Sequence, residues 1–271
     1  TGFMTVSRII PLISDFNKHD EKLWLESLQS AFNKSNKEHG ELCKGEFKIV
    51  PHDQVDENIK SEVEVAIVSN PDLPALDEYL NLVWVQNLWA GVDKLLPVIR
   101  SRAINVVRMH DRQLAVSMSE TVLMWVLNLY RDMPAYREQQ SMKQWQQLPA
   151  KLPHECTVSV LGLGELGQVT AMRLRDNGFN VLGWSRTPKQ LPDIETRTGE
   201  LGLDEVLVKA DIVVVLLPLT KETNGLLNLE KLQLLKEQAS IINFARGHII
   251  SEKDLSVSYT HLRAHETPIN L

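Results

Sequence analysis

Long hydrophobic runs are missing from this sequence of 271 residues. No stretch approaches the roughly 20 consecutive apolar residues that a membrane-spanning helix needs. The short apolar segment 9–13 is interrupted by Pro11, so it does not have the form of a signal-peptide core. These absences argue against a membrane-embedded protein, and we expect the chain to reside in the cytoplasm.

Cysteine is scarce as well, with Cys43 and Cys156 as the only two in the sequence. Neither belongs to a CxxC motif or to a cluster of Cys and His residues that could make up the four ligands of a zinc site. The sequence therefore predicts no disulfide framework and no metal site, which fits a reducing compartment.

Blocks of positive charge are also absent. The 29 Lys and Arg residues are scattered among 35 Asp and Glu residues, and the net charge is −6. A negative chain without a basic stripe is a poor match for a polyanion, so we expect no nucleic-acid partner.

What the first hundred residues do contain is a regular alternation of short apolar runs with polar or helical stretches. Segment 21–32 has its apolar residues at helical spacing. The runs expected as strands are 8–13, 47–50, 63–69, 82–86 and 104–108. Such alternation predicts parallel strands with crossover helices.

Residues 111–133 form the longest helical pattern. Leu114, Met118, Val122 and Leu129 follow one side, while Leu123, Met124 and Leu127 widen the apolar surface beyond one face. A helix that is apolar over so much of its surface is usually buried against two partners. We expect it to be clamped between two domains, and a contact with a second copy of the chain stays open.

A second alternating array begins at Cys156, after the proline-containing stretch 146–153. Strands are expected at 156–162, 179–184, 211–218 and 239–247, with helices at 165–177, 204–210 and 228–238. This order predicts a doubly wound nucleotide-binding sheet of the Rossmann type.

The turn after the first of these strands carries Gly162, Gly164 and Gly167 in a GxGxxG pattern. The first glycine permits a tight turn, the second lets a pyrophosphate approach the backbone, and the third lets helix and strand pack closely. The helix that begins at Glu165 and Leu166 directs its first N–H groups and the positive end of its dipole toward that anion. The pattern predicts a dinucleotide site, against the alternative of a purely structural turn.

The next strand ends at Trp184, and Ser185, Arg186 and Thr187 follow it where an NAD-binding fold often has an acid. A hydroxyl and a guanidinium suit a ribose 2′-phosphate, whereas an acid would repel it. We therefore predict NADP (NADPH) rather than NAD. The alternative, a solvated surface arginine at position 186, stays open.

Several motifs of the sequence resemble those of the D-2-hydroxyacid dehydrogenase family. The run 217–250, LPLTKETNGLLNLEKLQLLKEQASIINFARGHII, carries the resemblance together with the glycine loop. NLWAGVDKLL (87–96), WSRT (184–187) and the helix before YREQQSMKQWQQLP (136–149) most resemble the glyoxylate/hydroxypyruvate reductases of that family. The resemblance is specific from about Trp84 to Leu255 and is one of pattern only before that.

The resemblance implies roles for particular residues. The backbone N–H groups of Ala90, Gly91 and Val92 would bind the substrate carboxylate, although Trp89 stands where relatives often have glycine. Arg246 would bind the same carboxylate and polarise the ketone oxygen, with a plain salt bridge as the alternative. Leu217, Pro218 and Ala245 would line the cofactor cleft.

The fold class that we predict is α/β, with two doubly wound parallel-sheet domains. Residues 1–103 would form a flavodoxin-like substrate domain, and residues 104–255 a Rossmann NADP-binding domain that includes the long helix. The resemblance further implies a homodimeric enzyme that reduces a small 2-oxo acid, glyoxylate or hydroxypyruvate, by hydride transfer.

The proton donor implied by the resemblance, a histidine supported by a glutamate after Arg246, is not recognisable. Ser251 and Asp254 open a helix, but residues 256–271 lack the expected pattern and resemble an unrelated tail. We expect neither His261 nor His265 to be catalytic and assign no role to His248. Loss of a general acid costs about 10²- to 10⁴-fold in rate, so impaired turnover is expected.

Two other functions stay open. The first is another activity of the same family, on D-lactate, phosphoglycerate or formate. A nucleotide-sensing scaffold similar to the C-terminal binding protein corepressors is the second, although the sequence has no basic tail or interaction arm.

Overall fold

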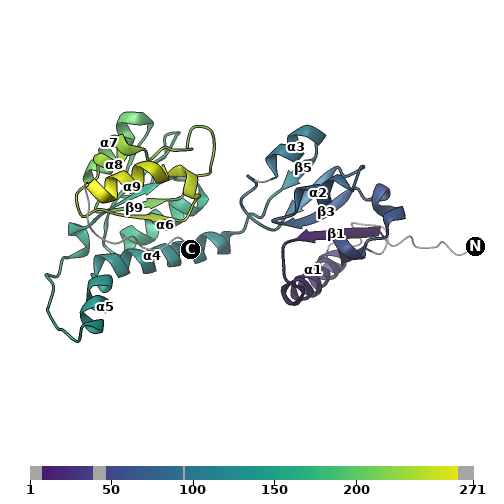
Figure 1. The fold of residues 1–271 in the computed structure, drawn as a ribbon, viewed down its shortest axis with the longest axis horizontal. Helices are drawn as coiled ribbons and strands as arrows, with labels where there is room; N and C mark the ends of the chain where they lie inside the picture. Colours follow the sequence, from purple (N-terminus) through teal and green to yellow (C-terminus); the bar gives the residue numbers. More distant parts are fainter. Residues whose placement is uncertain (1–7, 39–46, 94, 262–271) are drawn as a thin grey trace, which may run out of the picture. The chain divides into compact units, whose positions relative to one another are not determined.

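The computed structural model describes residues 8–38, 47–93 and 95–261, and the chain divides into two compact units after His110. Each unit is built on one five-stranded sheet of parallel strands, with helices on both faces (Figure 1). Within these described residues, no helix combines the length and the apolarity needed to cross a membrane.

The first unit has the strand order β2-β1-β3-β4-β5. Its elements are β1 (Arg8–Ser14), α1 (Lys18–Glu38), β2 (Phe47–Pro51), the 3-10 helices η1 (His52–Gln54) and η2 (Glu57–Glu62), β3 (Val65–Ser69), α2 (Leu73–Asp77), β4 (Trp84–Asn87), α3 (Leu96–Arg102) and β5 (Asn105–Val107). This order is the flavodoxin-like one, as predicted.

Alternation along the strands fills two separate cores in this unit. In β1, Ile10 and Leu12 face the core under α1, and Ile13 faces the opposite core under α2 and α3. Successive side chains of a strand point to opposite faces of the sheet, so a strand buried on both sides is apolar throughout.

The second unit has the strand order β10-β9-β6-β7-β8, the doubly wound Rossmann order. Its elements are α4 (Arg112–Tyr130), α5 (Met133–Ser141), η3 (Pro153–Glu155), β6 (Thr157–Leu161), α6 (Glu165–Asp176), β7 (Asn180–Trp184), β8 (Glu195–Arg197), α7 (Gly199–Lys209), β9 (Ile212–Val215), α8 (Leu229–Gln233), β10 (Ser240–Asn243), η4 (Gly247–Ile249) and α9 (Glu252–His261). The predicted fold class is confirmed for both units.

Helices α4 and α6 cover one face of the second sheet, and α7 and α8 cover the other. Val122 and Val126 of α4 are fully buried in the first of these cores, and Glu120 pairs with Arg173 of α6 at 3.5 Å. Met124 and Leu127 are nevertheless 54% and 38% exposed. Part of the apolar surface of α4 is therefore exposed, and the expectation that the helix is clamped between two domains stays a prediction.

The domain boundary differs from the predicted one after residue 103. Strand β5 pairs in parallel with β4, with Trp84 opposite Asn105 and Gln86 opposite Val107. Segment 104–108 therefore completes the first sheet and does not open the second unit, which begins at Asp111. The sequence pattern of a strand does not reveal which sheet it joins.

Two helices also differ in length from the prediction. The predicted helix 228–238 is reduced to α8, because tight i to i+3 bonds at Leu234 and Leu235 end it and turn Leu235 into the core. By contrast, α9 continues past residue 255 to His261, where no continuation was expected. His265 and the rest of segment 262–271 lie outside the described residues.

The single described cysteine, Cys156, lies just before β6 and is buried. Burial raises the pKa of its thiol to about 11, so the thiol is neutral at pH 7 and is a poor nucleophile or metal ligand. Cys43 lies outside the described residues.

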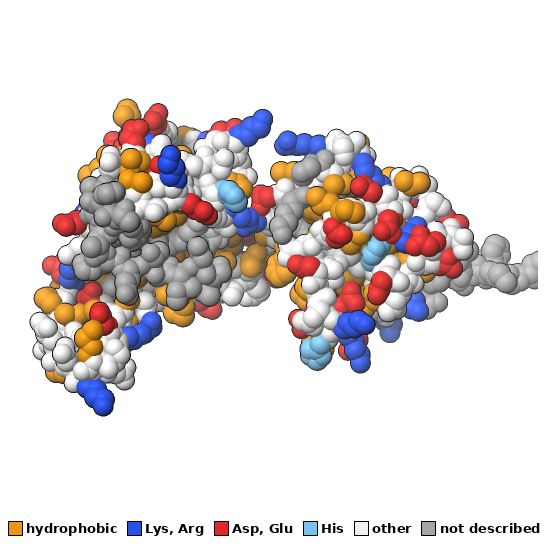
Figure 2. Space-filling view, viewed as in Figure 1, with side chains coloured by type: hydrophobic (Ala, Val, Ile, Leu, Met, Phe, Trp, Pro, Cys, Tyr) orange, Lys and Arg blue, Asp and Glu red, His pale blue; other side chains and the backbone are white. Residues whose placement is uncertain are grey.

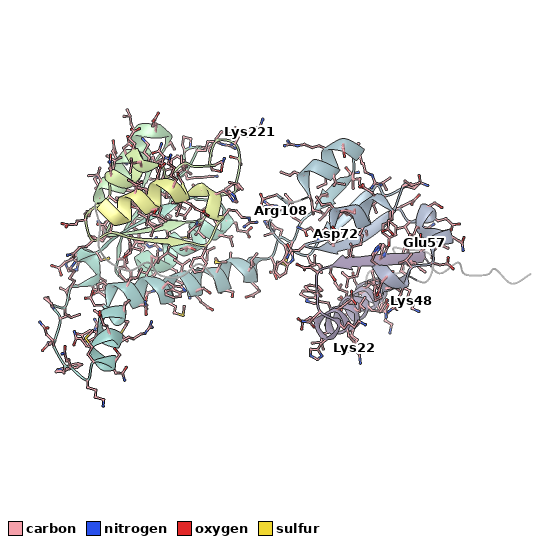
Figure 3. The ribbon with its side chains drawn as sticks, in the orientation of Figure 1. Lys22, Lys48, Glu57, Asp72, Arg108 and Lys221 are labelled. Carbon is pink, nitrogen blue, oxygen red and sulfur yellow. The ribbon has the colours of Figure 1, made fainter. Side chains whose placement is uncertain are left out.

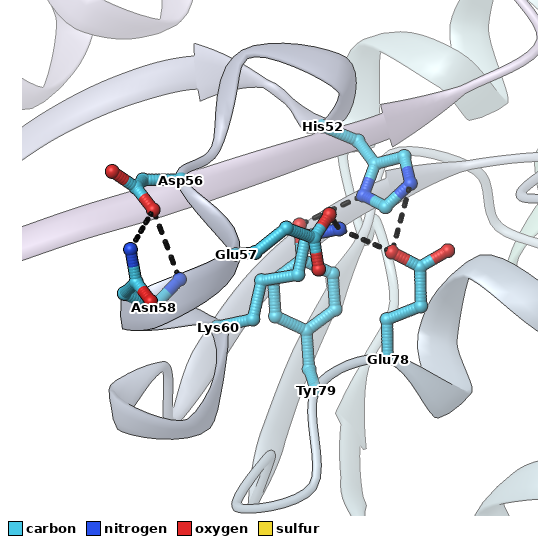
Figure 4. A network of polar contacts seen from close by, with 7 residues as sticks. All are labelled: His52, Asp56, Glu57, Asn58, Lys60, Glu78 and Tyr79. Carbon is cyan, nitrogen blue, oxygen red and sulfur yellow. Dashed lines mark hydrogen bonds and ion pairs between the residues drawn. The ribbon is translucent and has the colours of Figure 1, made fainter.

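A polar network fastens the connection between β2 and β3 to the end of α2 (Figure 4). The buried Lys60 ammonium donates to Glu57 and, at 2.5 Å, to Glu78, and both hydrogen bonds raise the pKa of Lys60. His52 lies between the two sides, with Nδ1 at 2.8 Å from the Tyr79 hydroxyl and Nε2 at 3.7 Å from Glu78. The network closes one end of the core of the first unit.

Replacing Tyr79 by Phe removes only the hydroxyl, and we expect it to lower the free energy of unfolding by about 1 kcal/mol at neutral pH. Burial raises the pKa of Tyr79 to about 12, against about 10 in an unfolded chain. The folded state therefore holds this proton more tightly. The contribution of Tyr79 is complete below about pH 10 and is lost as the pH rises toward the folded-state pKa.

Denaturant unfolding of the wild type and Y79F between pH 7 and pH 11 measures this difference. The Asn81→Ala variant is the control, because Asn81 donates to the Ser61 carbonyl from the same region and does not ionise. A stability gap between wild type and Y79F that stays constant above pH 10 would contradict the assignment.

Candidate functional site

The glycine loop lies at the point where the second sheet reverses its strand order, between β6 and β9. Gly162 has a φ of +104°, and a Cβ on it would meet the Leu216 carbonyl oxygen at 2.7 Å. A Cβ on Gly167 would lie 1.7 Å from the Gly162 carbonyl oxygen. Both positions therefore exclude any larger residue, because α6 packs directly against the turn that follows β6.

Gly164 differs from these two, because a Cβ on it would meet nothing within 4 Å. Gly164 is exposed and forms the N-cap of α6, so the N–H groups of Glu165 and Leu166 begin the helix beside open space. The folded chain by itself does not require glycine there. The approach of a bound anion to the backbone does explain it.

The turn after β7 holds the three residues predicted to read a 2′-phosphate. Arg186 and Thr187 are exposed, as such a role requires. Ser185 is buried, its N–H donates to the Arg197 carbonyl, and its hydroxyl donates to the Thr187 carbonyl at 2.7 Å. Ser185 thus shapes the turn, and its hydroxyl is already engaged within the protein.

Sequence reasoning missed Glu222, which lies in the loop after β9. A hydrogen bond with the Thr220 hydroxyl is the main cause that lowers the pKa of the Glu222 carboxyl, and the positive charges of Arg186 and Lys221 lower it further. The loops after β7 and β9 thus bring opposite charges into each other's field beside the glycine loop. Figure 3 shows Lys221 extending from this loop toward solvent.

The loop after β4 contains Ala90, Gly91 and Val92, which were predicted to bind a carboxylate. Three carbonyl groups here accept hydrogen bonds from the first unit itself. Asn87 donates to Trp89 at 2.9 Å and to Gly91 at 2.7 Å, the Met109 N–H also donates to Trp89, and Arg108 donates to Ala90 at 3.3 Å. Asn87 and Arg108 were not found by sequence reasoning, because nothing in their local pattern marks them.

Arg246 follows β10 at the carboxyl edge of the second sheet and is exposed. The Asn243 amide donates to the Arg246 carbonyl at 3.0 Å, and the Asn243 side-chain oxygen accepts from the Ala245 N–H at 2.9 Å. Asn243 thus closes the turn that presents Arg246. The predicted cleft residues Leu217, Pro218 and Ala245 belong to the same sheet edge, where Leu217 is buried and Pro218 is exposed.

The described charged side chains do not gather on the visible face of the molecule. Figure 2 shows cationic and acidic side chains interspersed over both units on that face. The predicted site residues lie instead at the carboxyl edges of the two sheets, where ligands of doubly wound folds bind.

Two glycine variants separate the role of the fold from that of a ligand. We expect Gly164→Ala to leave the midpoint of thermal unfolding almost unchanged and to weaken dinucleotide binding at least tenfold, since a methyl group would occupy the place of the pyrophosphate. Gly167→Ala should instead destabilise the second unit, because its methyl group would collide with backbone.

Thermal unfolding and a fluorescence titration with NADPH test both variants. Gly247→Ala is the control, since a Cβ there also meets nothing within 4 Å, yet the position lies outside the glycine loop. Unchanged NADPH affinity in G164A would sink the assignment of the loop to a pyrophosphate.

Residues 123–263, more than half of the chain, match the family described as D-isomer specific 2-hydroxyacid dehydrogenase, NAD binding domain. The glyoxylate/hydroxypyruvate reductase A of Yersinia enterocolitica is 35% identical over 198 residues, 71% of this chain and 63% of that protein. The protein of the same name from Photorhabdus laumondii is 34% identical over 201 residues, 72% of this chain and 64% of that protein. The chain thus spans less than two thirds of the length of these curated relatives.

Solved structures agree with this match. A D-isomer specific 2-hydroxyacid dehydrogenase from Xanthobacter autotrophicus, in complex with NADPH and MES, has a TM-score of 0.80 and 31% identity, covering 98% of this chain and 84% of its own. An NADPH-dependent glyoxylate/hydroxypyruvate reductase from Sinorhizobium meliloti, in complex with NADP and sulfate, has a TM-score of 0.78 and 28% identity, covering 94% and 78%. The chain therefore belongs to the D-isomer specific 2-hydroxyacid dehydrogenase family, and its second unit contains the NAD-binding domain of that family.

Proposed function

We propose that this protein reduces a small 2-oxo acid, glyoxylate or hydroxypyruvate, with NADPH as the hydride donor. The observation that carries the proposal is the open, glycine-lined start of α6 at the reversal point of the second sheet. The printed names of relatives, which include NADPH-dependent glyoxylate/hydroxypyruvate reductase, support the choice of substrate and cofactor.

The second unit has the residues to hold the cofactor. The N–H groups of Glu165 and Leu166 would bind the pyrophosphate, and Gly164 leaves room for its approach. A bound nicotinamide cofactor would supply the hydride for the ketone carbon. Leu217, Pro218 and Ala245 would contact it along the carboxyl edge of the sheet.

The preference for NADP over NAD rests on the turn after β7. Arg186 and Thr187 are exposed and suit a 2′-phosphate, whereas the Ser185 hydroxyl is held by Thr187. One charge-assisted hydrogen bond is worth tenfold to hundredfold in affinity, on the order of 1.5–3 kcal/mol. We therefore expect a preference for NADPH over NADH of about tenfold to hundredfold.

Two groups would receive the 2-oxo acid. The N–H groups of Ala90, Gly91 and Val92 in the first unit would bind its carboxylate. As the resemblance to the family implies, the guanidinium of Arg246 would bind a carboxylate and stabilise the negative charge that develops on a ketone oxygen. Arginine suits this work, since it stays protonated and offers several donors in one plane.

The group that protonates the developing alkoxide is not assigned. The described histidines after Arg246 are His248 in η4 and His261 at the end of α9, and we assign a role to neither.

Fluorescence titration with NADPH and NADH, followed by NADPH oxidation with glyoxylate and hydroxypyruvate, tests the proposal. We expect tighter binding of NADPH than of NADH, and NADPH oxidation that Arg246→Gln abolishes without weakening NADPH binding. Arg131→Gln, at an exposed arginine that lies over the Tyr130 ring, is the control. Faster oxidation with the 2-oxo acids of D-lactate or phosphoglycerate dehydrogenases would assign the chain to another activity of the family, and equal affinity for NADH would refute the cofactor preference.

We also propose that the chain forms a homodimer in the cytoplasm, through the exposed side of α4. Met124 and Leu127 lie three residues apart on this helix, so their side chains share one face. An exposed apolar face of a helix is a common surface for contact with another protein chain.

Leu127→Asp should turn such a dimer into a monomer, because it places a charge in an apolar contact. Sedimentation velocity over a range of concentrations measures the change. Val208→Asp, at an exposed apolar residue of α7, is the matched control. A wild type that sediments as a monomer at every concentration would overturn the dimer.

A further inference from the structure

Asn87 is the last residue of β4, and only 2% of its surface is exposed. A buried amide must satisfy its hydrogen-bonding groups within the protein, because leaving them unpaired is costly. The Asn87 amide nitrogen does so by donating to two carbonyl groups of the loop that follows, those of Trp89 at 2.9 Å and Gly91 at 2.7 Å. One side chain thereby determines the direction of two peptide units.

The direction of a peptide carbonyl also determines that of an N–H group. In a trans peptide unit the C=O of one residue and the N–H of the next point in opposite directions. Holding the Trp89 carbonyl on Asn87 turns the Ala90 N–H away from Asn87, and holding the Gly91 carbonyl does the same for the Val92 N–H. Arg108, which donates to the Ala90 carbonyl at 3.3 Å, has the corresponding effect on the Gly91 N–H.

The N–H groups of Ala90 and Val92 therefore both point away from Asn87, and the N–H group of Gly91 points away from Arg108. Consecutive backbone N–H groups that converge on one side form a concave site for anions. Such a site binds well only if the protein has already oriented its donors, since a loop that must be ordered by the ligand weakens binding.

The same loop is held at a second place. The Trp89 indole N–H donates to the Ser69 hydroxyl at 2.8 Å, and Ser69 ends β3, the strand next to β4. The Met109 N–H donates to the Trp89 carbonyl from the segment after β5. Figure 3 labels Arg108 in this segment. The loop is therefore tied to strands on both sides of β4. Among its described hydrogen-bond donors, only Asn87 holds two of the carbonyl groups of Trp89, Ala90 and Gly91.

We propose that Asn87 is a positioning residue for the 2-oxo acid: its buried amide holds the carbonyls of Trp89 and Gly91 so that the N–H groups of Ala90 and Val92 receive the substrate carboxylate. Asn87 itself does not touch the substrate. This inference rests on the proposed function, because it assumes that the loop binds the carboxylate of a 2-oxo acid.

The test measures binding of oxamate, a 2-oxo acid analogue with an unreactive carbonyl, by calorimetry on the NADPH-loaded full chain. Asn87→Ala should weaken oxamate binding by about tenfold to hundredfold, the worth of an oriented hydrogen bond to a charged group. Affinity for NADPH should not change, because the groups proposed to bind it lie in the second unit. Asn105→Ala is the matched control, since its amide donates to the Val83 carbonyl in the same sheet, away from the loop.

A purely structural role predicts a different result. In that case Asn87→Ala lowers the midpoint of thermal unfolding, but at 10 °C, where the variant is folded, it binds oxamate as the wild type does; that result would overturn the inference. If Asn87→Ala does not fold, Asn87→Ser, which keeps one donor, replaces it and should give an intermediate affinity. A wild type that binds NADPH but no oxamate would refute the proposed substrate site itself, and so the two failures are distinguishable.

Discussion

The close approach of helix α6 to strand β6 is the contact on which the geometry of the second unit depends. At Gly167 the helix comes so near the preceding turn that a Cβ would overlap the Gly162 carbonyl, and at Gly162 the turn itself lies against the backbone after β9. This packing brings the first N–H groups of α6 to the gap between β6 and β9, where the strand order reverses. A helix displaced by even one methyl group would direct those donors elsewhere.

Parallel strands then decide which loops can act together. Because every strand of the second sheet ends at the same edge, the turn after β7 and the loop after β9 flank the glycine loop, and the turn after β10 lies next to the loop after β9. Arg186, Glu222 and Arg246 come from these three segments, which are far apart in the sequence. For this reason the positive charge of Arg186 contributes to lowering the pKa of Glu222.

The first unit solves a related problem, that of presenting backbone donors, by a different physical means. No long helix begins at the Ala90–Val92 loop, so a dipole does not orient its N–H groups. Each N–H group shares a peptide unit with a carbonyl group and points the opposite way. Asn87, Arg108 and Met109 hold these carbonyl groups by hydrogen bonds and so fix the direction of the N–H groups. In the proposed function, both units offer main-chain N–H groups to an anion, one through helix geometry and the other through side chains that fix carbonyl groups.

The sequence by itself determined the features that depend on neighbouring residues. Strand periodicity, the helix 112–130 and the spacing of Gly162, Gly164 and Gly167 were all predictable, because each reflects local backbone geometry. Only the tertiary structure decided that β5 joins the first sheet, that Leu235 ends α8 by entering the core, that Ser185 is buried and that the charge of Arg186 lowers the pKa of Glu222. The tertiary structure also decides what the Asn87 amide contacts, although its partners are only a few residues away in the sequence. Folding buries this amide, so the loop carbonyls replace water as its hydrogen-bond acceptors. A sequence pattern records which residues can bury a face or make a turn, whereas burial and the packing of distant segments decide what each polar group contacts.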